Sequence, residues 1–326
     1  MCSGNKRKET LTYAQIKKDI DRMYRLRGSS FAVIFTGGEP TLLGEDLLEA
    51  IAYADSLDVT TRIITNAHWA RTPELAKSKL QELAECGLCE INISTDDYHA
   101  KYIPFEYVKN AWFAAKGMGF NSVIIGCCYS DDSTITPDYI ESQFGEKLQH
   151  RFESPGKEAK LDKRSEDGTI YAMSNTHVQK LGRASKELDD SSFYFNEDRS
   201  AFYGKCPTIM KTATVSPGNH LWGCCGFECG DGGLLDMGDL SKYSLNALIK
   251  KSEKSLIVAS LKTFGPMFLV DFVESKDPTV RFKERYSCVC AICEDLLRNE
   301  KAIQVINANR KELWDTIKAS NLLTAS

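Results

Sequence analysis

The regular alternation of helix-like and strand-like segments constrains the fold of this 326-residue chain more than any other feature. Apolar side chains recur at helical spacing in some segments and form short uninterrupted runs in others. The expected helices are 12–27, 44–57, 73–86 and 104–116, and the expected strands are 31–35, 61–65, 90–94 and 121–127. Short connections between such segments favour an α/β fold with a parallel sheet and right-handed crossovers.

Local signals support these boundaries. Thr12 and Gln15 form a capping box at the start of the first expected helix. Thr72 and Pro73 stand at N-cap and N1 of the third, and Gly87 ends it. A further strand and its loop are expected within 170–190, and the charged stretch 157–168 is expected to be a surface excursion. A terminal helix is expected over 301–322.

Polar and glycine-rich positions follow the expected strands. In parallel α/β folds, ligands bind where the carboxyl ends of the strands meet. These ends carry Gly37-Gly38-Glu39-Pro40, Asn66, Ser94-Thr95-Asp96-Asp97 and Cys127-Cys128. The sequence therefore predicts a ligand site at this edge of the sheet.

The string Thr36-Gly37-Gly38-Glu39-Pro40 is the most specific of these motifs. Two glycines at a strand end let the backbone approach a ligand closely, although a plain tight turn is the alternative for Gly-Gly alone. After a buried strand, the full string resembles the S-adenosylmethionine (SAM) signature of the radical SAM superfamily. The resemblance implies that the backbone of Gly37, Gly38, Glu39 and Pro40 holds the amino group of the SAM methionine.

Later strand ends extend the resemblance. Ile64-Thr65-Asn66 resembles the family's third strand end, which implies that Asn66 contributes to the SAM site. The run from Ser94 to His99 resembles the fourth, which implies that Ser94 and Asp96 face SAM. His99 alone is as readily a structural hydrogen-bonding residue. Gly182-Arg183-Ala184 resembles the sixth-strand loop, so Arg183 is expected to pair with the SAM carboxylate, a solvated surface arginine being the alternative.

Twelve cysteines are many for a chain that is expected to be cytoplasmic, and seven of them lie beyond residue 200. In a reducing compartment such a cluster favours a metal over disulfides. The earlier cysteines 86, 89, 127 and 128 sit in or beside apolar patterns and are expected to be buried small hydrophobes.

Cys206, Cys224 and the pair Cys290-x-x-Cys293 can supply four thiolates to zinc or to an iron–sulfur cluster, and spacing does not separate the two. A turn at 216–219 predicts a β-hairpin that presents Cys206 and Cys224 together. The pattern resembles the SPASM and twitch auxiliary-cluster domains of radical SAM peptide-modifying enzymes. The resemblance implies one [4Fe–4S] cluster on these four cysteines, with Cys229 and Cys288 as spare or alternative ligands.

Cys225 adjoins an expected ligand and is expected to point the other way along a strand. The pair Cys224-Cys225 is similar to one in radical SAM peptide epimerases. That similarity implies that Cys225 is catalytic and returns a hydrogen atom to the substrate radical. An inert buried thiol is the alternative.

The C-x-x-x-C-x-x-C triplet that binds the SAM cluster in this superfamily does not occur in the sequence. The chain starts at Met1-Cys2, where the family places the end of the cluster loop. Truncation of the first strand and its loop is the simpler explanation, and loss of the cluster is the rival. As written, the chain is not expected to cleave SAM.

A formal net charge of −4 gives no electrostatic reason to expect nucleic acid or an anionic membrane as a partner. No apolar run reaches the length of a membrane span, so a cytoplasmic protein is expected. The expected organisation is a partial (β/α)6 radical SAM barrel over 1–200 and an auxiliary-cluster domain over 201–326.

The resemblance implies an enzyme that cleaves SAM reductively and modifies a peptide or protein by hydrogen abstraction, with epimerisation as one outcome. An electron donor such as flavodoxin or ferredoxin is implied as a partner. The alternative is a degenerate, non-catalytic metal-binding scaffold. A third reading, an unrelated α/β enzyme with a zinc module, requires the Gly37–Pro40 string to be coincidental.

Overall fold

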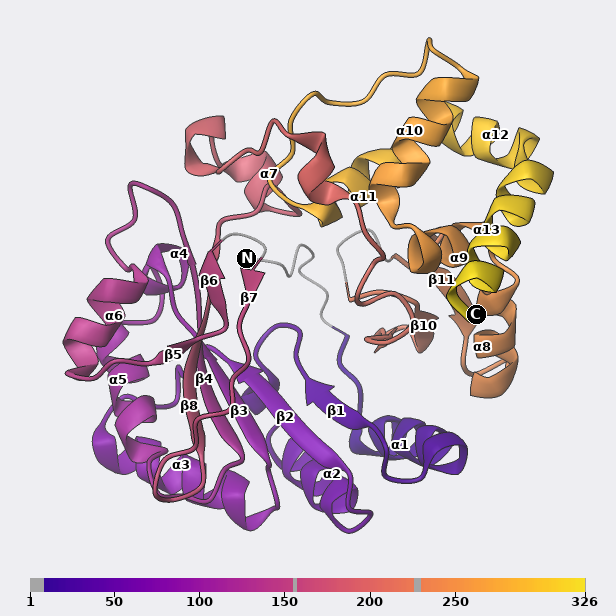
Figure 1. Ribbon diagram of the computed structural model, residues 1–326. Helices are drawn as coiled ribbons and strands as arrows, with labels where there is room; N and C mark the ends of the chain where they lie inside the picture. Colours follow the sequence, from indigo (N-terminus) through magenta and orange to yellow (C-terminus); the bar gives the residue numbers. More distant parts are fainter. Residues whose placement is uncertain (1–8, 155–156, 226–229, 326) are drawn as a thin grey trace. The chain divides into compact units, whose positions relative to one another are not determined.

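A computed structural model describes residues 9–154, 157–225 and 230–325 (Figure 1). Cys2 and Cys229 fall outside these residues. The chain divides into two compact units, one of Thr10–Val178 and one that contains Gln179–Ser326. Each unit is described by itself below. The functional boundary expected at residue 200 stays a prediction.

The first unit is built on a six-stranded sheet in the order β1-β2-β3-β4-β8-β5, and all its neighbouring strands pair in parallel. Its strands are β1 (Ala32–Phe35), β2 (Thr60–Thr65), β3 (Glu90–Ser94), β4 (Ser122–Tyr129), β5 (Gln149–His150) and β8 (Ile170–His177). The expected α/β class and parallel sheet are confirmed. Within the described residues the sheet is open at β1 and β5, and closure into a barrel is not seen.

Helices cover one face of this sheet (Figure 1). They are α1 (Tyr13–Arg27), α2 (Glu45–Asp55), α3 (Pro73–Glu85), α5 (Phe105–Ala114) and α6 (Pro137–Phe144). The core between helices and sheet includes Leu47, Leu80 and Ile91, each at most 1% exposed, and the fully buried Trp112. Burial of this apolar face stabilises the sheet and fixes which side chains point to its other face.

The other face of the sheet carries the alternate side chains, and most of these are polar. Arg62 of β2 and Glu90 of β3 are register partners, and their side chains form an ion pair of 2.5 Å. Near the carboxyl end, the Cys128 thiol lies 3.5 Å from the Thr176 hydroxyl of its partner strand β8. Cys128 is exposed, so the expectation that it is a buried hydrophobe is wrong, whereas Cys127 on the helix side is buried. The cause is the two-residue period of the strand.

All four expected helices and all four expected strands of the first 130 residues are present within a few residues of their predicted bounds. The short helix α4 (Asp97–Ala100) was not predicted. Only Thr95 and Asp96 separate it from β3, and Asp96 is its N-cap residue. The expected surface excursion opens with β7 (Lys157–Glu158), which pairs with β6 (Phe152–Ser154), before it returns to β8.

In the second unit, a three-stranded antiparallel sheet in the order β11-β10-β9 precedes a set of helices. Its strands are β9 (Thr214–Val215), β10 (His220–Trp222) and β11 (Asp236–Asp239). Its helices are α7 (Ala184–Glu187), α8 (Leu245–Glu253), α9 (Leu256–Thr263), α10 (Pro266–Lys276), α11 (Val289–Arg298), α12 (Glu300–Ala308) and α13 (Arg310–Ala325). The single terminal helix expected over 301–322 is in fact two, divided at Asn309, whose amide donates to the carbonyl of Val305.

No single helix in the described part of the chain is long and apolar enough to cross a membrane. The pair α9 and α10 reaches that length and composition only together, across a bend of 115°.

Candidate functional site

The turn after β1 exposes its backbone. Gly37 has φ +124°, a conformation that L side chains rarely adopt, so this position requires glycine. A Cβ atom added at Gly37 or at Gly38 would meet nothing within 4 Å. Both residues are exposed, and a one-turn 3-10 helix starts at Pro40. The peptide groups of this turn are therefore open to a ligand.

Glu39 ties this turn to the next strand end. Its Oε1 accepts hydrogen bonds from the hydroxyls of Thr41 and Thr65, both at 2.7 Å. Its Oε2 accepts a hydrogen bond of 2.8 Å from the backbone N–H of Asn66. The carboxylate thus acts within the protein and fixes the ends of β1 and β2 side by side.

Asn66 in turn shapes the loop after β2. Its side-chain oxygen accepts a 2.9 Å hydrogen bond from the N–H of His68. The hydroxyl of Thr65 accepts from the indole N–H of Trp69 at 3.1 Å. Between them, Ala67 is fully buried and adopts φ +58°, an uncommon conformation for a residue with a side chain. Asn66, a predicted SAM ligand, therefore also helps to hold this loop in one shape.

Asp96 acts as the N-cap of α4. Its Oδ1 accepts hydrogen bonds from the backbone N–H groups of Tyr98 and His99, and lies 2.9 Å from Nδ1 of His99. Asp96 is only 3% exposed, so burial opposes its ionisation, but the hydrogen bonds from His99 outweigh burial and lower the pKa of Asp96. His99 is thus a structural partner of Asp96, the role that the sequence allowed for it.

Ser94 is the last residue of β3 and lies on the polar face of the sheet, opposite Gly126 of β4. The next residue, Thr95, donates its backbone N–H to the carbonyl of Gly126 at 2.8 Å. The first unit therefore brings the turn at Gly37 and Gly38, the Asn66 loop and Ser94 to the carboxyl edge of three adjacent strands.

Arg183 belongs to the second unit, at the start of α7, and is not placed relative to this edge. Its guanidinium lies 4.0 Å from the carboxylate of Glu187, and its side chain is 44% exposed. Its expected pairing with a SAM carboxylate stays a prediction.

The four predicted cluster cysteines all belong to the second unit, where they affect one another's pKa. Burial raises the pKa of the Cys293 thiol, and the nearby thiols of Cys290, Cys224 and Cys206 raise it further. The pKa of the Cys290 thiol is also raised, mainly by desolvation, although part of this residue is exposed. The thiols of Cys288, Cys224, Cys206 and Cys225 raise it further. Thiols brought this close disfavour one another's ionisation, and a bound metal would reverse this effect.

The donor set therefore suits a thiophilic metal or an iron–sulfur cluster. Within the described residues, however, no three His, Cys, Asp or Glu side chains stand in a ligating arrangement, so no coordination geometry follows. Cys288 is the N-cap residue of α11, and its thiol is among those that raise the pKa of Cys290.

Cys225 lies beside Cys224. The strand that was expected to carry both residues ends at Trp222. Gly223 still donates its N–H to the carbonyl of Leu235, and the two cysteines follow beyond the end of the strand. The two cysteines therefore do not alternate across a strand, and that expectation is wrong. A hydrogen bond with the Cys224 thiol, followed by burial, raises the pKa of Cys225. Cys225 is nevertheless exposed, as a hydrogen donor to a substrate would have to be.

The hairpin forms with the expected turn, but Cys206 lies eight positions before β9 and is not part of it. It is held instead through its backbone N–H, which donates to the carbonyl of Leu261 in α9 at 2.9 Å. The Cys206 thiol lies 3.6 Å from the hydroxyl of Thr208.

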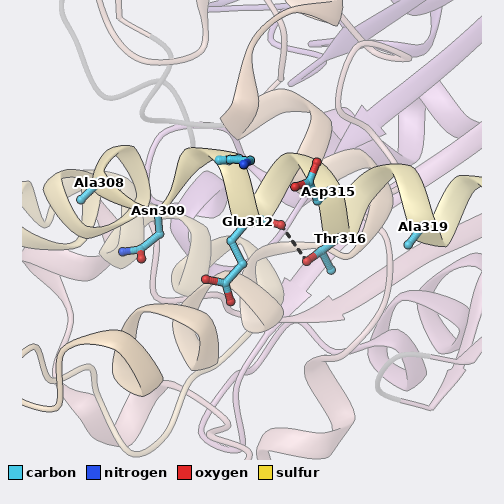
Figure 2. Close-up of a pocket in the computed structure, with 7 residues that line it drawn as sticks. Ala308, Asn309, Glu312, Asp315, Thr316 and Ala319 are labelled. Carbon is cyan, nitrogen blue, oxygen red and sulfur yellow. Dashed lines mark hydrogen bonds between the residues drawn. The ribbon is translucent and has the colours of Figure 1, made fainter.

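A shallow hollow lies on α12 and α13, the last two helices, which contain no cysteine (Figure 2). It is lined by Ala308, Asn309, Lys311, Glu312, Asp315, Thr316 and Ala319. The Thr316 hydroxyl donates to the carbonyl of Glu312 one turn earlier, so it is satisfied within the helix. This hollow contains none of the predicted site residues.

The Arg62–Glu90 ion pair was missed from the sequence, since one charge lies in each of two strands 28 residues apart. Alternation within each strand could have found it: both residues occupy the face opposite the buried Ile63 and Ile91.

No protein-family model matches the chain. It is 36% identical over 73 residues to an S-adenosylmethionine-dependent nucleotide dehydratase from Pseudoalteromonas ulvae, a match that covers 22% of each protein. It is 40% identical over 62 residues to a PqqA peptide cyclase from Bradyrhizobium diazoefficiens, which covers 19% of this chain and 15% of that relative. The chain thus matches less than a quarter of the length of either curated relative. At this coverage the matches support the radical SAM resemblance and go no further.

Proposed function

We propose that this chain carries the SAM-binding sheet and an auxiliary iron–sulfur site of a radical SAM enzyme that modifies a peptide or protein. The observation that carries the proposal is the exposed turn at Gly37 and Gly38, which Glu39 fastens to the Asn66 strand end. Such open peptide groups at the carboxyl edge of a parallel sheet suit a small polar ligand. The name of one partial relative includes SAM dependence.

Each predicted site residue has a separate role in this proposal. The backbone of Gly37–Pro40 binds the amino group of SAM, while Asn66 and Ser94 line the same edge. Asp96 acts indirectly, because it holds α4 and His99 in place. Arg183 pairs with the SAM carboxylate. With one electron from a SAM cluster, whose three-cysteine loop this sequence lacks, bound SAM would be cleaved to methionine and a 5′-deoxyadenosyl radical that abstracts a substrate hydrogen atom.

Cys206, Cys224, Cys290 and Cys293 hold the auxiliary cluster, for which zinc is the competing occupant. Cys225 is the hydrogen donor if the reaction is an epimerisation. A peptide substrate is favoured by the second partial relative, which is named as a peptide cyclase. Flavodoxin or ferredoxin is the expected electron donor.

The experiment is SAM binding, because this sequence lacks the three-cysteine loop that reductive cleavage requires. We expect saturable binding of labelled SAM in equilibrium dialysis and competition by S-adenosylhomocysteine. Ser94→Ala should weaken binding about 3- to 10-fold through loss of one hydrogen bond. Ser78→Ala, at an exposed position of α3, is the matched control.

The scaffold alternative predicts a different result. A chain that binds metal through its cysteines but shows no saturable SAM binding would favour a metal-binding scaffold over an enzyme.

A further inference from the structure

Asp97 joins two segments that follow neighbouring strands of the first unit. β3 and β4 pair in parallel, so the chain leaves both strands at the carboxyl edge of the sheet. Asp97 stands three residues after Ser94, the last residue of β3. Its Oδ2 accepts the backbone N–H of Thr134 at 2.8 Å, and its Oδ1 accepts that of Ile135 at 2.9 Å. One carboxylate therefore binds two successive peptide groups of the connection between β4 and α6.

This connection, residues 130–136, is also bonded within itself and to β4. The hydroxyl of Ser133 accepts the backbone N–H of Ser130 at 2.9 Å, and the N–H of Ser133 donates to the carbonyl of Ser130 at 3.0 Å. Ile135 is 6% exposed, and its carbonyl lies 3.6 Å from the thiol of Cys127. The connection is therefore an ordered segment, and its contact with Asp97 fixes it at the carboxyl edge.

Asp96 and Asp97 bond in different directions, although they are neighbours in the chain. Asp96 bonds to backbone N–H groups within α4, whereas Asp97 reaches the segment after β4. Just before them, Thr95 donates its backbone N–H to the carbonyl of Gly126 in β4. The segment that follows Ser94 is thus bonded both to β4 and to the connection after β4.

We propose that Asp97 is a positioning residue for SAM binding, because it holds the connection 130–136 to α4 and so preserves the arrangement of the ends of β3 and β4. The SAM part of this inference rests on the proposed function, whereas the link between the two segments does not. Asp97 itself is assigned no contact with SAM. A ligand that binds a pre-ordered edge loses less free energy to ordering the protein. Removal of the carboxylate should therefore weaken SAM binding indirectly.

Asp167 provides a matched control in the same unit. It stands three residues before β8, at the amino edge of the same sheet. Its carboxylate accepts the backbone N–H groups of Gly117 and Thr169, both at 2.9 Å, and the hydroxyl of Tyr171 at 2.7 Å. Asp97 and Asp167 thus each accept two backbone N–H groups, but only Asp97 lies at the carboxyl edge.

The test compares Asp97→Ala and Asp167→Ala in the full chain. Affinity for labelled SAM is measured by equilibrium dialysis, and the free energy of unfolding by urea denaturation. Both variants should lose stability, since each lacks a carboxylate that accepts backbone hydrogen bonds. We expect Asp97→Ala to weaken SAM binding about 3- to 10-fold and Asp167→Ala to leave it unchanged.

Asp97→Asn keeps one acceptor oxygen, so its SAM affinity should lie between those of the unaltered chain and Asp97→Ala. This milder variant also serves if Asp97→Ala does not fold. Unaltered SAM affinity in both Asp97 variants, or equal loss in Asp97→Ala and Asp167→Ala, would overturn the inference.

A second readout needs no SAM. Cys127 is 1% exposed, and its thiol bonds to the carbonyl of Ile135 in the connection. We expect iodoacetamide to alkylate Cys127 several-fold faster in Asp97→Ala than in Asp167→Ala, as mapped by peptide mass spectrometry. Failure of the unaltered chain to bind SAM would refute the proposed function, while the alkylation rates still decide whether Asp97 holds the connection. Equal Cys127 rates in the two variants would refute the positioning role.

Discussion

The carboxylate of Glu39 accepts a 2.8 Å hydrogen bond from the backbone N–H of Asn66, and this contact joins the turn after β1 to the end of β2. The same side chain accepts the hydroxyls of Thr41 and Thr65. The glutamate of the Gly-Gly-Glu-Pro string therefore forms hydrogen bonds within the protein. The peptide groups of the two glycines stay open to a ligand.

Glu39→Gln should destabilise the first unit. A glutamine side chain has one acceptor oxygen where glutamate has two, so one of the donors at Thr65 or Asn66 loses its partner. We expect the free energy of unfolding to fall by about 1–2 kcal/mol, measured by urea denaturation. Glu106→Gln, whose side chain is 64% exposed on α5, is the control and should change little. Equal stability of both variants would contradict the role of Glu39.

Alanine substitutions at Gly37 and Gly38 distinguish an effect on stability from an effect on SAM binding. Gly37→Ala should cost about 1–3 kcal/mol of stability because φ +124° strains any residue with a Cβ atom. Gly38→Ala should leave stability nearly unchanged, since its Cβ would meet nothing within 4 Å. If SAM binds against this backbone, Gly38→Ala should still weaken SAM binding. A Gly38→Ala chain with normal stability and normal SAM affinity would place the ligand elsewhere.

Asp96 gives the stability of the first unit a pH dependence. Its pKa is lower in the folded chain than in the unfolded chain, so the ionised carboxylate stabilises the fold above its unfolded pKa of about 3.9. This contribution is lost as pH falls through the lower, folded pKa. Asp96→Asn keeps a good N-cap residue. The stability gap between the two chains, measured by urea denaturation, should therefore shrink from neutral pH to about pH 3. A difference in unfolding free energy between the two chains that increases at low pH would contradict the lowered pKa of Asp96.

Gly265 holds the segment that leads to Cys206. Its φ is +82°, and an added Cβ would lie 1.9 Å from the carbonyl oxygen of Gly204 and 3.7 Å from the backbone nitrogen of Cys206. Gly265→Ala must therefore displace the chain next to a predicted ligand. We expect a loss of about 2 kcal/mol or more in unfolding free energy together with weaker metal binding. Gly230→Ala, where a Cβ would meet nothing within 4 Å, is the control. Unaltered thermal unfolding of Gly265→Ala would show that the close approach is relieved without cost.

The parallel sheet could be predicted because its signals are local. Apolar runs such as Phe31–Phe35 and helix starts such as Thr72-Pro73 are read from a few neighbouring residues, and the structure follows them. The position of β8 between β4 and β5 could not be predicted, because it depends on pairing between residues such as Gly126 and Ser174 that are far apart in the chain. The interruption at Asn309 is also invisible to helical periodicity.

The sequence named candidate site residues, and their assignment to a SAM site stays a prediction. The string at Gly37–Pro40 forms an exposed turn, and sequence could not show that the carboxylate of Glu39 bonds within the protein. Asp96 is expected to face SAM, which stays a prediction, and sequence did not show that its carboxylate caps α4 and bonds to His99. Cys225 was expected on a strand, but that strand ends at Trp222, three residues earlier. The Glu39 contact joins residues 27 positions apart, which no local pattern shows, whereas the Asp96 contacts lie within three residues of it.

The most direct test of the account is the metal content of the cysteine site. The chain would be reconstituted anaerobically with iron and sulfide and compared with a variant in which Cys206, Cys224, Cys290 and Cys293 are serine. The account predicts about four irons per chain, as for one [4Fe–4S] cluster, and their loss in the variant. Zinc in place of iron, or iron retained without the four cysteines, would contradict it.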